Sequence, residues 1–355
     1  MGNNSSSTRS TIAPIFDIKN KIPQIQQDRL GYVIPNSPTT HALKSIFETA
    51  GTKQELKASK NINMETKRDL YGNATYNYES TSNTFEISIA DYKKVLTRQD
   101  VMTRKIFNFI LEKYNQQKDD TIHFTLYEIV ERGLYKNKDT ARRGVDRAIA
   151  KLMLIHVKGT TTKGKKTTSI SRCQLIMESK VANSSYIKVK PSLYNYLSQY
   201  YTMLPTWGDQ LKGKAYSILD YIYYRARQEM KNIKEKNSFN ISLRTLNDHL
   251  AQPSPEDTRR HTEYIIDPIL EAIEEIEMVQ AQHKEASNEM MSLQIQPVYP
   301  DNYSNANDFL NGYLIISLDD KTEGYLIDLE DKFNKKKQAN INRIKALKEA
   351  PKKEE

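Results

Sequence analysis

The stretch Lys136–Val157, KNKDTARRGVDRAIAKLMLIHV, decides the fold of this chain. An α-helix turns about 100° per residue, which gathers the apolar residues of this stretch on one side: Ala141, Val145, Ala148, Ile149 and Leu152. The opposite side carries short polar and basic residues, which are Thr140, Arg143, Arg147 and Lys151, with Arg142 on the flank. Asn137 or Asp139 can cap the beginning of such a helix. We therefore predict a helix that packs one face on a core and presents a basic ridge on the other.

A second stretch, Ser254–Val279 (SPEDTRRHTEYIIDPILEAIEEIEMV), repeats this pattern in a constant register. The register aligns Thr125-Leu126, Arg142-Arg143 and Ile149 with Ser242-Leu243, Arg259-Arg260 and Ile266. The second helix is predicted to bury Ile265, Ile266, Ile269 and Ile273. Its outer side is predicted to present Arg260, His261 and Tyr264, with Arg259 beside them. Pro268 lies inside this helix and predicts a kink or a restart at that point.

Each copy contains one order of predicted elements: a strand, three helices, a hairpin and a closing strand. This is the order of a winged helix, in which a β-hairpin is appended to a helix-turn-helix. The predicted fold class is therefore α+β and mainly helical, with two tandem winged-helix domains related by internal duplication. The predicted divisions are a flexible polar arm at 1–83, winged-helix domains at 84–200 and 201–330, and a basic, lysine-rich C-terminal tail at 331–355.

The stretch Gly159–Thr168, GTTTKGKKTT, comes within one residue of a phosphate-binding loop. Lys166 stands where the magnesium-binding hydroxyl belongs, and the β-branched residues that follow predict a returning strand instead of a helix. We therefore interpret the stretch as a basic hairpin, or wing, rather than as a nucleotide site. Its residues predicted to contact DNA phosphates are Lys158, Lys163, Lys165, Lys166 and Arg172.

The composition of the 355 residues excludes several classes of function. No apolar run approaches the ~20 residues that cross a bilayer, so we expect a soluble, cytoplasmic protein with no membrane partner. The one cysteine, Cys173, suits a reducing compartment. The six histidines show no metal-ligand spacing, and we expect no metal, no cofactor and no catalytic residue. The net charge of +9 is moderate, so its concentration on the predicted helix and hairpin is what indicates an anionic partner.

Three phrases carry a resemblance to a known family: YIKVKPSLYNYL from Tyr186, KGKAYSILDYIYYRARQ from Lys212 and YIIDPILEAIEEIE from Tyr264. Through them, residues 85–320 resemble the tandem winged-helix replication initiators of theta-replicating bacterial plasmids, the iteron-binding Rep family, and related phage or mobile-element proteins. The resemblance implies that both domains grip one origin repeat and that the protein exists as homodimer and monomer. It also implies recruitment of host replication proteins such as the replicative helicase.

We therefore expect a sequence-specific double-stranded DNA-binding protein that initiates plasmid or mobile-element replication at origin repeats. In this hypothesis the outer faces of the two predicted helices read bases, and the wing holds the backbone. One alternative is a transcription regulator or partition protein, which binds DNA without unwinding it. Another is a nicking rolling-circle initiator that uses Tyr196 or Tyr200, whose Y-x3-Y spacing occurs in such enzymes. Trp207 is predicted to anchor the turn between the two domains.

Overall fold

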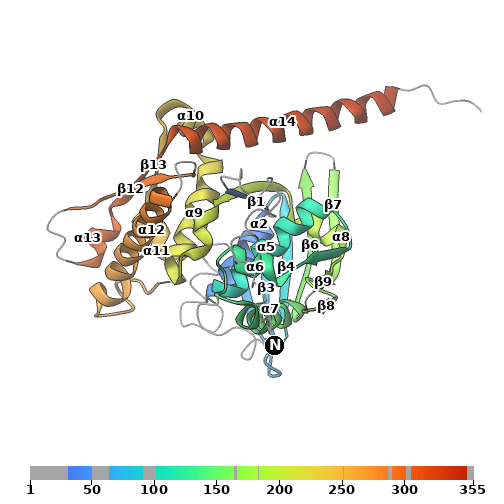
Figure 1. Cartoon of the computed structure of the whole chain (residues 1–355), viewed down its shortest axis with the longest axis horizontal. Helices are drawn as coiled ribbons and strands as arrows, with labels where there is room; N and C mark the ends of the chain where they lie inside the picture. Colours follow the sequence, from blue (N-terminus) through green and yellow to red (C-terminus); the bar gives the residue numbers. More distant parts are fainter. Residues whose placement is uncertain are drawn as a thin grey trace, which may run out of the picture.

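The computed structural model describes residues 31–49, 64–90, 101–163, 166–182, 184–250, 252–286, 290–300 and 305–349. These residues form an α+β structure, in agreement with the predicted class. Two halves follow each other along the chain, joined by strand β10 (Tyr200–Pro205) and a short 3-10 helix at Thr206–Gln210 (Figure 1). Within the described ranges, no helix combines the length and the apolar character that crossing a bilayer requires.

The first half is organised around a central helix that is buried along most of its length. Its helices are α2 (Pro38–Thr49), α5 (Val101–Gln117), α6 (Leu126–Glu131), α7 (Lys138–Met153) and α8 (Pro191–Leu197). Helix α5 contacts α2, α7 and β1, and even its Arg104, Lys105 and Glu112 are buried. Its strands, apart from β10, are β1 (Gly31–Asn36), β2 (Met64–Arg68), β3 (Ala74–Glu79), β4 (Asn83–Ile89), β5 (Thr121–Phe124), β6 (Ile155–Lys163), β7 (Lys166–Gln174), β8 (Glu178–Lys180) and β9 (Ser185–Lys188).

Two antiparallel sheets flank the helices of the first half. The small sheet has the order β5-β9-β8, and the large one has the order β2-β3-β4-β6-β7. Strands β6 and β7 form the predicted hairpin, with Lys163 paired to Lys166. The turn between them, Gly164 and Lys165, lies outside the described residues. The hairpin belongs to the large sheet, which it shares with the N-terminal strands β2, β3 and β4.

The second half contains a three-stranded sheet whose strand order matches that of the small sheet in the first half. Its helices are α9 (Gly213–Gln228), α10 (Met230–Lys236), α11 (Leu243–His249), α12 (Asp267–Ala286), α13 (Ala306–Leu310) and α14 (Asp320–Glu349). Its strands are β11 (Ser238–Ser242), β12 (Leu293–Val298) and β13 (Tyr313–Leu318), in the order β11-β13-β12. In the first half β5 pairs with β9, which also pairs with β8. In the second half β11 pairs with β13, which also pairs with β12.

The interpretation of 1–83 as a flexible arm is wrong for its described parts. Strand β1 pairs with β10 over six residues, and α2 buries Leu43, Ile46 and Phe47 in the common core. Strands β2 and β3 extend the sheet that contains β4 and β6. The apolar residues of this region are sparse locally, so the sequence pattern showed no second face for packing. The partners of β1 and Thr39, which are β10 and Tyr196, lie more than a hundred residues later in the chain.

A buried carboxylate on α9 of the second half links it to two helices of the first half, α2 and α5. Asp220 on α9 accepts a hydrogen bond at Oδ1 from Lys44 Nζ of α2 at 3.3 Å, and at Oδ2 it accepts two hydrogen bonds from Nε and Nη2 of Arg104 on α5. All three side chains are almost fully buried. Burial alone would raise the pKa of Asp220, but the two cations outweigh it and hold the pKa well below its usual range. Asp220 is therefore a charged group at the centre of the junction.

A second polar cluster joins α5 and α6 to the connecting segment. Lys105 Nζ donates to the backbone oxygens of Asp209 and Leu211, both at 2.6 Å. Arg132 donates to Asp209 Oδ2 at 2.7 Å and to Glu112 Oε2 at 2.6 Å. Because each buried charge has a hydrogen-bonded counterpart, the connecting segment is held in one position.

Trp207, in the connecting segment, is 1% exposed and donates Nε1–H to Met291 O at 2.8 Å. The prediction that Trp207 anchors the turn between the halves is confirmed.

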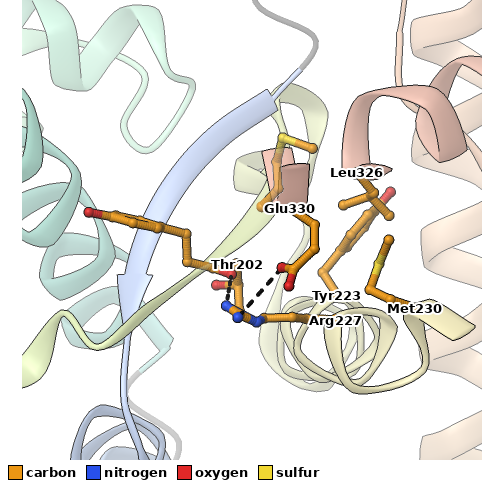
Figure 2. Close-up of a pocket in the computed structure, with 8 residues that line it drawn as sticks. Thr202, Tyr223, Arg227, Met230, Leu326 and Glu330 are labelled. Carbon is orange, nitrogen blue, oxygen red and sulfur yellow. Dashed lines mark hydrogen bonds and ion pairs between the residues drawn. The ribbon is translucent and has the colours of Figure 1, made fainter. Parts of the chain in front are cut away.

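The C-terminal helix α14 begins on the second half and extends beyond the rest of the molecule (Figure 1). Figure 2 shows Arg227 of α9 directed at Glu330 of α14, with a separation of 3.5 Å, beside a cavity of about 20 Å³ that Tyr223, Met230 and Leu326 help to line. The predicted boundary between 330 and 331 therefore falls inside a continuous helix. Alternation of charged and apolar residues continues across this point, and no helix-terminating residue interrupts it.

We expect Asp220→Asn to lower the free energy of unfolding by about 3–5 kcal/mol, because it removes the negative charge between two buried cations. Urea denaturation followed by circular dichroism measures the change. The matched control is Asp331→Asn, whose exposed carboxylate lies 3.8 Å from Lys234 and is worth less than about 1 kcal/mol. Similar losses for the two variants would contradict a central role for Asp220.

The difference in free energy of unfolding between wild type and Asp220→Asn should depend on pH. Because the folded pKa of Asp220 is depressed, its stabilisation is complete above the unfolded value of about 3.9 and disappears as the pH falls through the folded pKa. The difference between wild type and Asp220→Asn should therefore shrink below about pH 4.

Candidate nucleic-acid interface

Helix α7 has the two faces that its sequence predicts. Asn137 is its N-cap, and Asn137 Oδ1 accepts from the backbone N–H of Thr140 at 3.0 Å. Ala141, Val145, Ala148, Ile149 and Leu152 are all at most 3% exposed. The buried face is therefore confirmed residue by residue, and it packs on α5 and α6.

The outer face of α7 presents cations to solvent. Arg142, Arg143 and Arg147 are exposed, whereas Thr140 and Lys151 are half-buried. Thr140 Oγ1 donates to the backbone oxygen of Asn137 at 2.9 Å, so its hydroxyl proton is used within the cap. The helix carries five basic and two acidic residues, and the exposed arginines make its outer face suitable for phosphates and for guanine edges.

Two features of this face are not predicted from the sequence. Tyr127 of α6 is 57% exposed, and Lys138 Nζ lies 3.2 Å from its ring centroid, so an aromatic ring and a cation stand together at the beginning of α7. Gly144 leaves room for Tyr135, because a Cβ at this position would lie 2.1 Å from the tyrosine Oη. Each feature depends on single residues that do not recur along the helix, so the periodic pattern of the sequence does not reveal it.

The second arginine-bearing segment differs from the prediction in its register. Ile265, Ile266, Ile269 and Ile273 are buried as predicted, but Arg259 and Arg260 precede the helix instead of lying inside it. The physical reason is a separate turn, in which Ser254 donates N–H and O–H to Asp257 Oδ2 and takes up the residues that would form a first helical turn. The alignment of Arg260 with Arg143 therefore does not hold in space.

The outer residues of this segment are exposed to different degrees. Arg260 is exposed and contacts Glu263 at 3.2 Å, Arg259 is exposed, and Tyr264 is 43% exposed. His261 is half-buried, with its Nε2 at 3.0 Å from Pro255 O, so it is held against the preceding turn. Three of the four predicted residues thus remain available at the surface.

The predicted irregularity at Pro268 is confirmed. Residues Thr262–Ile266 form a π-helical turn, and Asp267 N–H donates to Thr262 O, five residues earlier. Proline has no N–H for the carbonyl four residues before it, so the ladder of hydrogen bonds shifts just ahead of it. Figure 1 shows the beginning of α12 and the whole of α7 along the lower edge of the view.

The tip of the predicted wing lies far from α7. Strand β6 begins at Ile155, directly after α7, and its nine residues carry the chain about 26 Å away before the turn. Figure 1 shows the far ends of β6 and β7 at the top of the first half and α7 at its bottom. Lys163 and Lys166 thus stand at the opposite end of the sheet, and the side chains of Lys163, Lys165 and Lys166 lie outside the described set. Lys158 and Arg172 are exposed nearer to α7.

Gly159 and Tyr196 lie in close contact. A Cβ at Gly159 would lie 2.4 Å from Tyr196 Oη, so this glycine makes room for the ring instead of wrapping a phosphate. Tyr196 is 3% exposed and donates to Thr84 O at 3.3 Å. Burial raises the pKa of Tyr200, which disfavours its nucleophilic phenolate. Among the described residues, no group of acidic, histidine or cysteine side chains could hold a metal ion.

A cavity of about 470 Å³ opens where α2, the β3–β4 hairpin, α9 and α11 meet. Its wall contains stacked rings: His41 lies 4.2 Å from Tyr224, and Tyr221 lies 4.1 Å from His249, centroid to centroid. Burial and the neighbouring cations lower the pKa of His41 to about 3, so its imidazole is neutral at physiological pH. The rings thus form an uncharged contact between α2 and the second half.

Comparisons with known proteins give a partial likeness of fold. No protein-family model matches this chain, and no curated protein matches it. Two crystal structures of domains 2 and 3 of RctB are similar to it. The first, a selenomethionine derivative, has 11% identity and a TM-score of 0.44 and covers 75% of this chain and 98% of its own. The second has 10% identity and a TM-score of 0.41 and covers 76% and 99%.

We expect Asn137→Ala to destabilise the protein by about 1 kcal/mol, because the backbone N–H of Thr140 loses its side-chain acceptor. Asn137→Ser is the matched control, since a serine hydroxyl can still cap the helix. Thermal unfolding measures the global effect, and amide hydrogen exchange at Thr140 and Ala141 measures fraying of the first turn. Equal behaviour of the alanine and serine variants would refute the capping role.

Proposed function

We propose that this protein is a non-enzymatic, sequence-specific double-stranded DNA-binding protein built from two winged-helix domains. In each half, a short strand, a second helix and a third helix follow a long first helix, and a three-stranded antiparallel sheet closes the unit. Helix α7 and the segment leading into α12 take the place of recognition helices, which enter the DNA major groove in this motif.

The exposed arginine face of α7 is the observation that carries the proposal. Arg142, Arg143 and Arg147 project from a helix whose opposite face is completely packed, so the helix cannot turn these residues inward. A guanidinium group can donate twice to guanine or to a phosphate. The exposed Arg259, Arg260 and Tyr264 supply a second, smaller contact from the other half.

We further propose that the protein initiates replication by binding origin repeats of a plasmid or mobile element, as a monomer or homodimer that recruits host proteins such as the replicative helicase. DNase footprinting on DNA that flanks the gene tests this proposal. Directly repeated protected sites are the expected result. A single inverted repeat would indicate a transcription regulator instead, and uniform protection without sites would contradict sequence-specific binding.

Each of the variants Arg143→Ala and Arg147→Ala should weaken binding to the preferred duplex by about 1–3 kcal/mol and relax its sequence preference, because base contacts are lost. Fluorescence anisotropy with the footprinted duplex and a scrambled duplex measures the two affinities. Identical losses on both duplexes would show that these arginines contact only the backbone.

Two sets of variants serve as controls for these arginines. Lys158→Ala and Arg172→Ala should weaken all DNA alike and reduce the slope of log K against log salt by about 1 each, as expected for phosphate contacts. Lys231→Ala removes an exposed lysine on α10, away from the proposed interface, and should leave both affinities unchanged.

A further inference from the structure

The turn between β2 and β3 is held rigidly by one carboxylate. Asp69 Oδ1 accepts from the backbone N–H groups of Tyr71 and Asn73, both at 2.9 Å, and Asp69 Oδ2 accepts from Asn73 Nδ2 at 2.7 Å. Gly72 has a φ of +83°, a conformation that favours glycine. The hydrogen bonds from Asn73 and Tyr71 lower the pKa of Asp69, which keeps it ionised. The turn therefore presents its tip in a fixed geometry.

The tip of this turn consists of two large apolar side chains in water. Leu70 is 103% exposed and Tyr71 is 85% exposed, whereas the next most exposed large apolar residue in the described ranges, Tyr127, is 57% exposed. Burying a leucine side chain is favourable, and the folded chain leaves this free energy unused. Exposed apolar side chains on a rigid support are typical of a contact surface.

The turn lies at the same end of the large sheet as α7. The pairs Ala74–Ile89 and Ile89–Ile155 place it beside the first residue of β6, and Ala90 N–H donates to Leu154 O at 3.2 Å, at the end of α7. Figure 1 shows the β2–β3 turn projecting below α7, at the opposite end of the sheet from the far ends of β6 and β7. A ligand on the outer face of α7 would therefore meet this turn before it met the tip of the predicted wing.

The chemistry of the hairpin fits an anionic partner with an apolar interior. Lys67 and Arg68 are exposed and are separated from the tip by Asp69 alone. Glu65 contacts Lys67 at 3.3 Å on the open surface, where such a pair is weak, and Asp69 is turned back into its own hydrogen bonds. An apolar wedge flanked by cations can enter the DNA minor groove, partly unstack a base step and kink the duplex.

We propose that Leu70 and Tyr71 insert into the minor groove next to the α7 contact and bend the bound DNA. This inference rests on the proposed function and replaces the β6–β7 tip by the β2–β3 turn as the structural wing of the first half. The bend costs unstacking energy, and the wider contact that it permits offsets this cost.

The test uses the full-length protein and the footprinted duplex, with a FRET pair at its ends and 2-aminopurine at successive steps beside the α7 contact. Wild type should bend the duplex and raise the 2-aminopurine fluorescence at one step. The double variant Leu70→Ser/Tyr71→Ser should bind about tenfold or more weakly, with a smaller bend and no fluorescence rise. Both residues are fully exposed, so its thermal unfolding should match wild type.

Met278→Ser, which changes an exposed apolar residue on α12, is the control and should bind and bend as wild type does. Wild-type bending by the double variant would overturn the wedge. Loss of binding to anionic phospholipid vesicles, with DNA bending intact, would also overturn it and indicate a membrane contact. If wild type binds no duplex, the proposed function itself is wrong, whereas unbent but specific binding refutes the wedge alone.

Discussion

The architecture depends on a carboxylate that is buried between three segments of distant sequence origin. Asp220 of α9 meets Lys44 of α2 and Arg104 of α5, and all three are nearly inaccessible to water. Two charges removed from water repay their desolvation only when geometry and partners are well matched. An apolar contact tolerates sliding, but this cluster specifies one arrangement of the two halves. The second cluster around Asp209 fixes the connecting segment in the same way.

This rigid junction has consequences for binding. Two DNA-reading surfaces on a flexible linker would each search separately, and the second contact would cost additional ordering entropy. Here the spacing between α7 and the start of α12 is set before any ligand arrives. Under the proposed function, DNA whose sites match this spacing would bind without that cost, and DNA with a different spacing would have to deform.

The local periodicity of the sequence predicted much of the candidate interface but little of how the N-terminal elements pack on the rest of the chain. The buried and exposed faces of α7, the β6–β7 hairpin and the disturbance at Pro268 depend on residues within one or two turns of each other. By contrast, β1 and α2 find their partners at β10, α8 and α9. Sparse apolar residues such as Ile34 and Phe47 carry no periodic signal, although they are fully buried. Contacts this distant in sequence are invisible to a pattern that is read along the chain.

The missed and misplaced site residues have the same origin. Arg259 and Arg260 lie outside their helix because a side-chain hydrogen bond of Ser254 competes with helix formation, which a constant register cannot foresee. The far end of β6 is distant from α7 because β6 pairs with β4 and so belongs to the large sheet. Leu70 and Tyr71 belong to a region whose composition resembles a loop, and only their exposure in three dimensions draws notice.

The pairing of β1 with β10 has a consequence for synthesis on the ribosome. Gly31 pairs with Pro205, so the first described strand must wait until the ribosome has made the strand that completes it. At 5–20 residues per second, this interval lasts roughly 10–35 s. During this interval, the backbone edge of β1 lacks the strand with which it pairs in the folded protein. The first half therefore cannot complete its folding until the connecting segment with β10 has been synthesised.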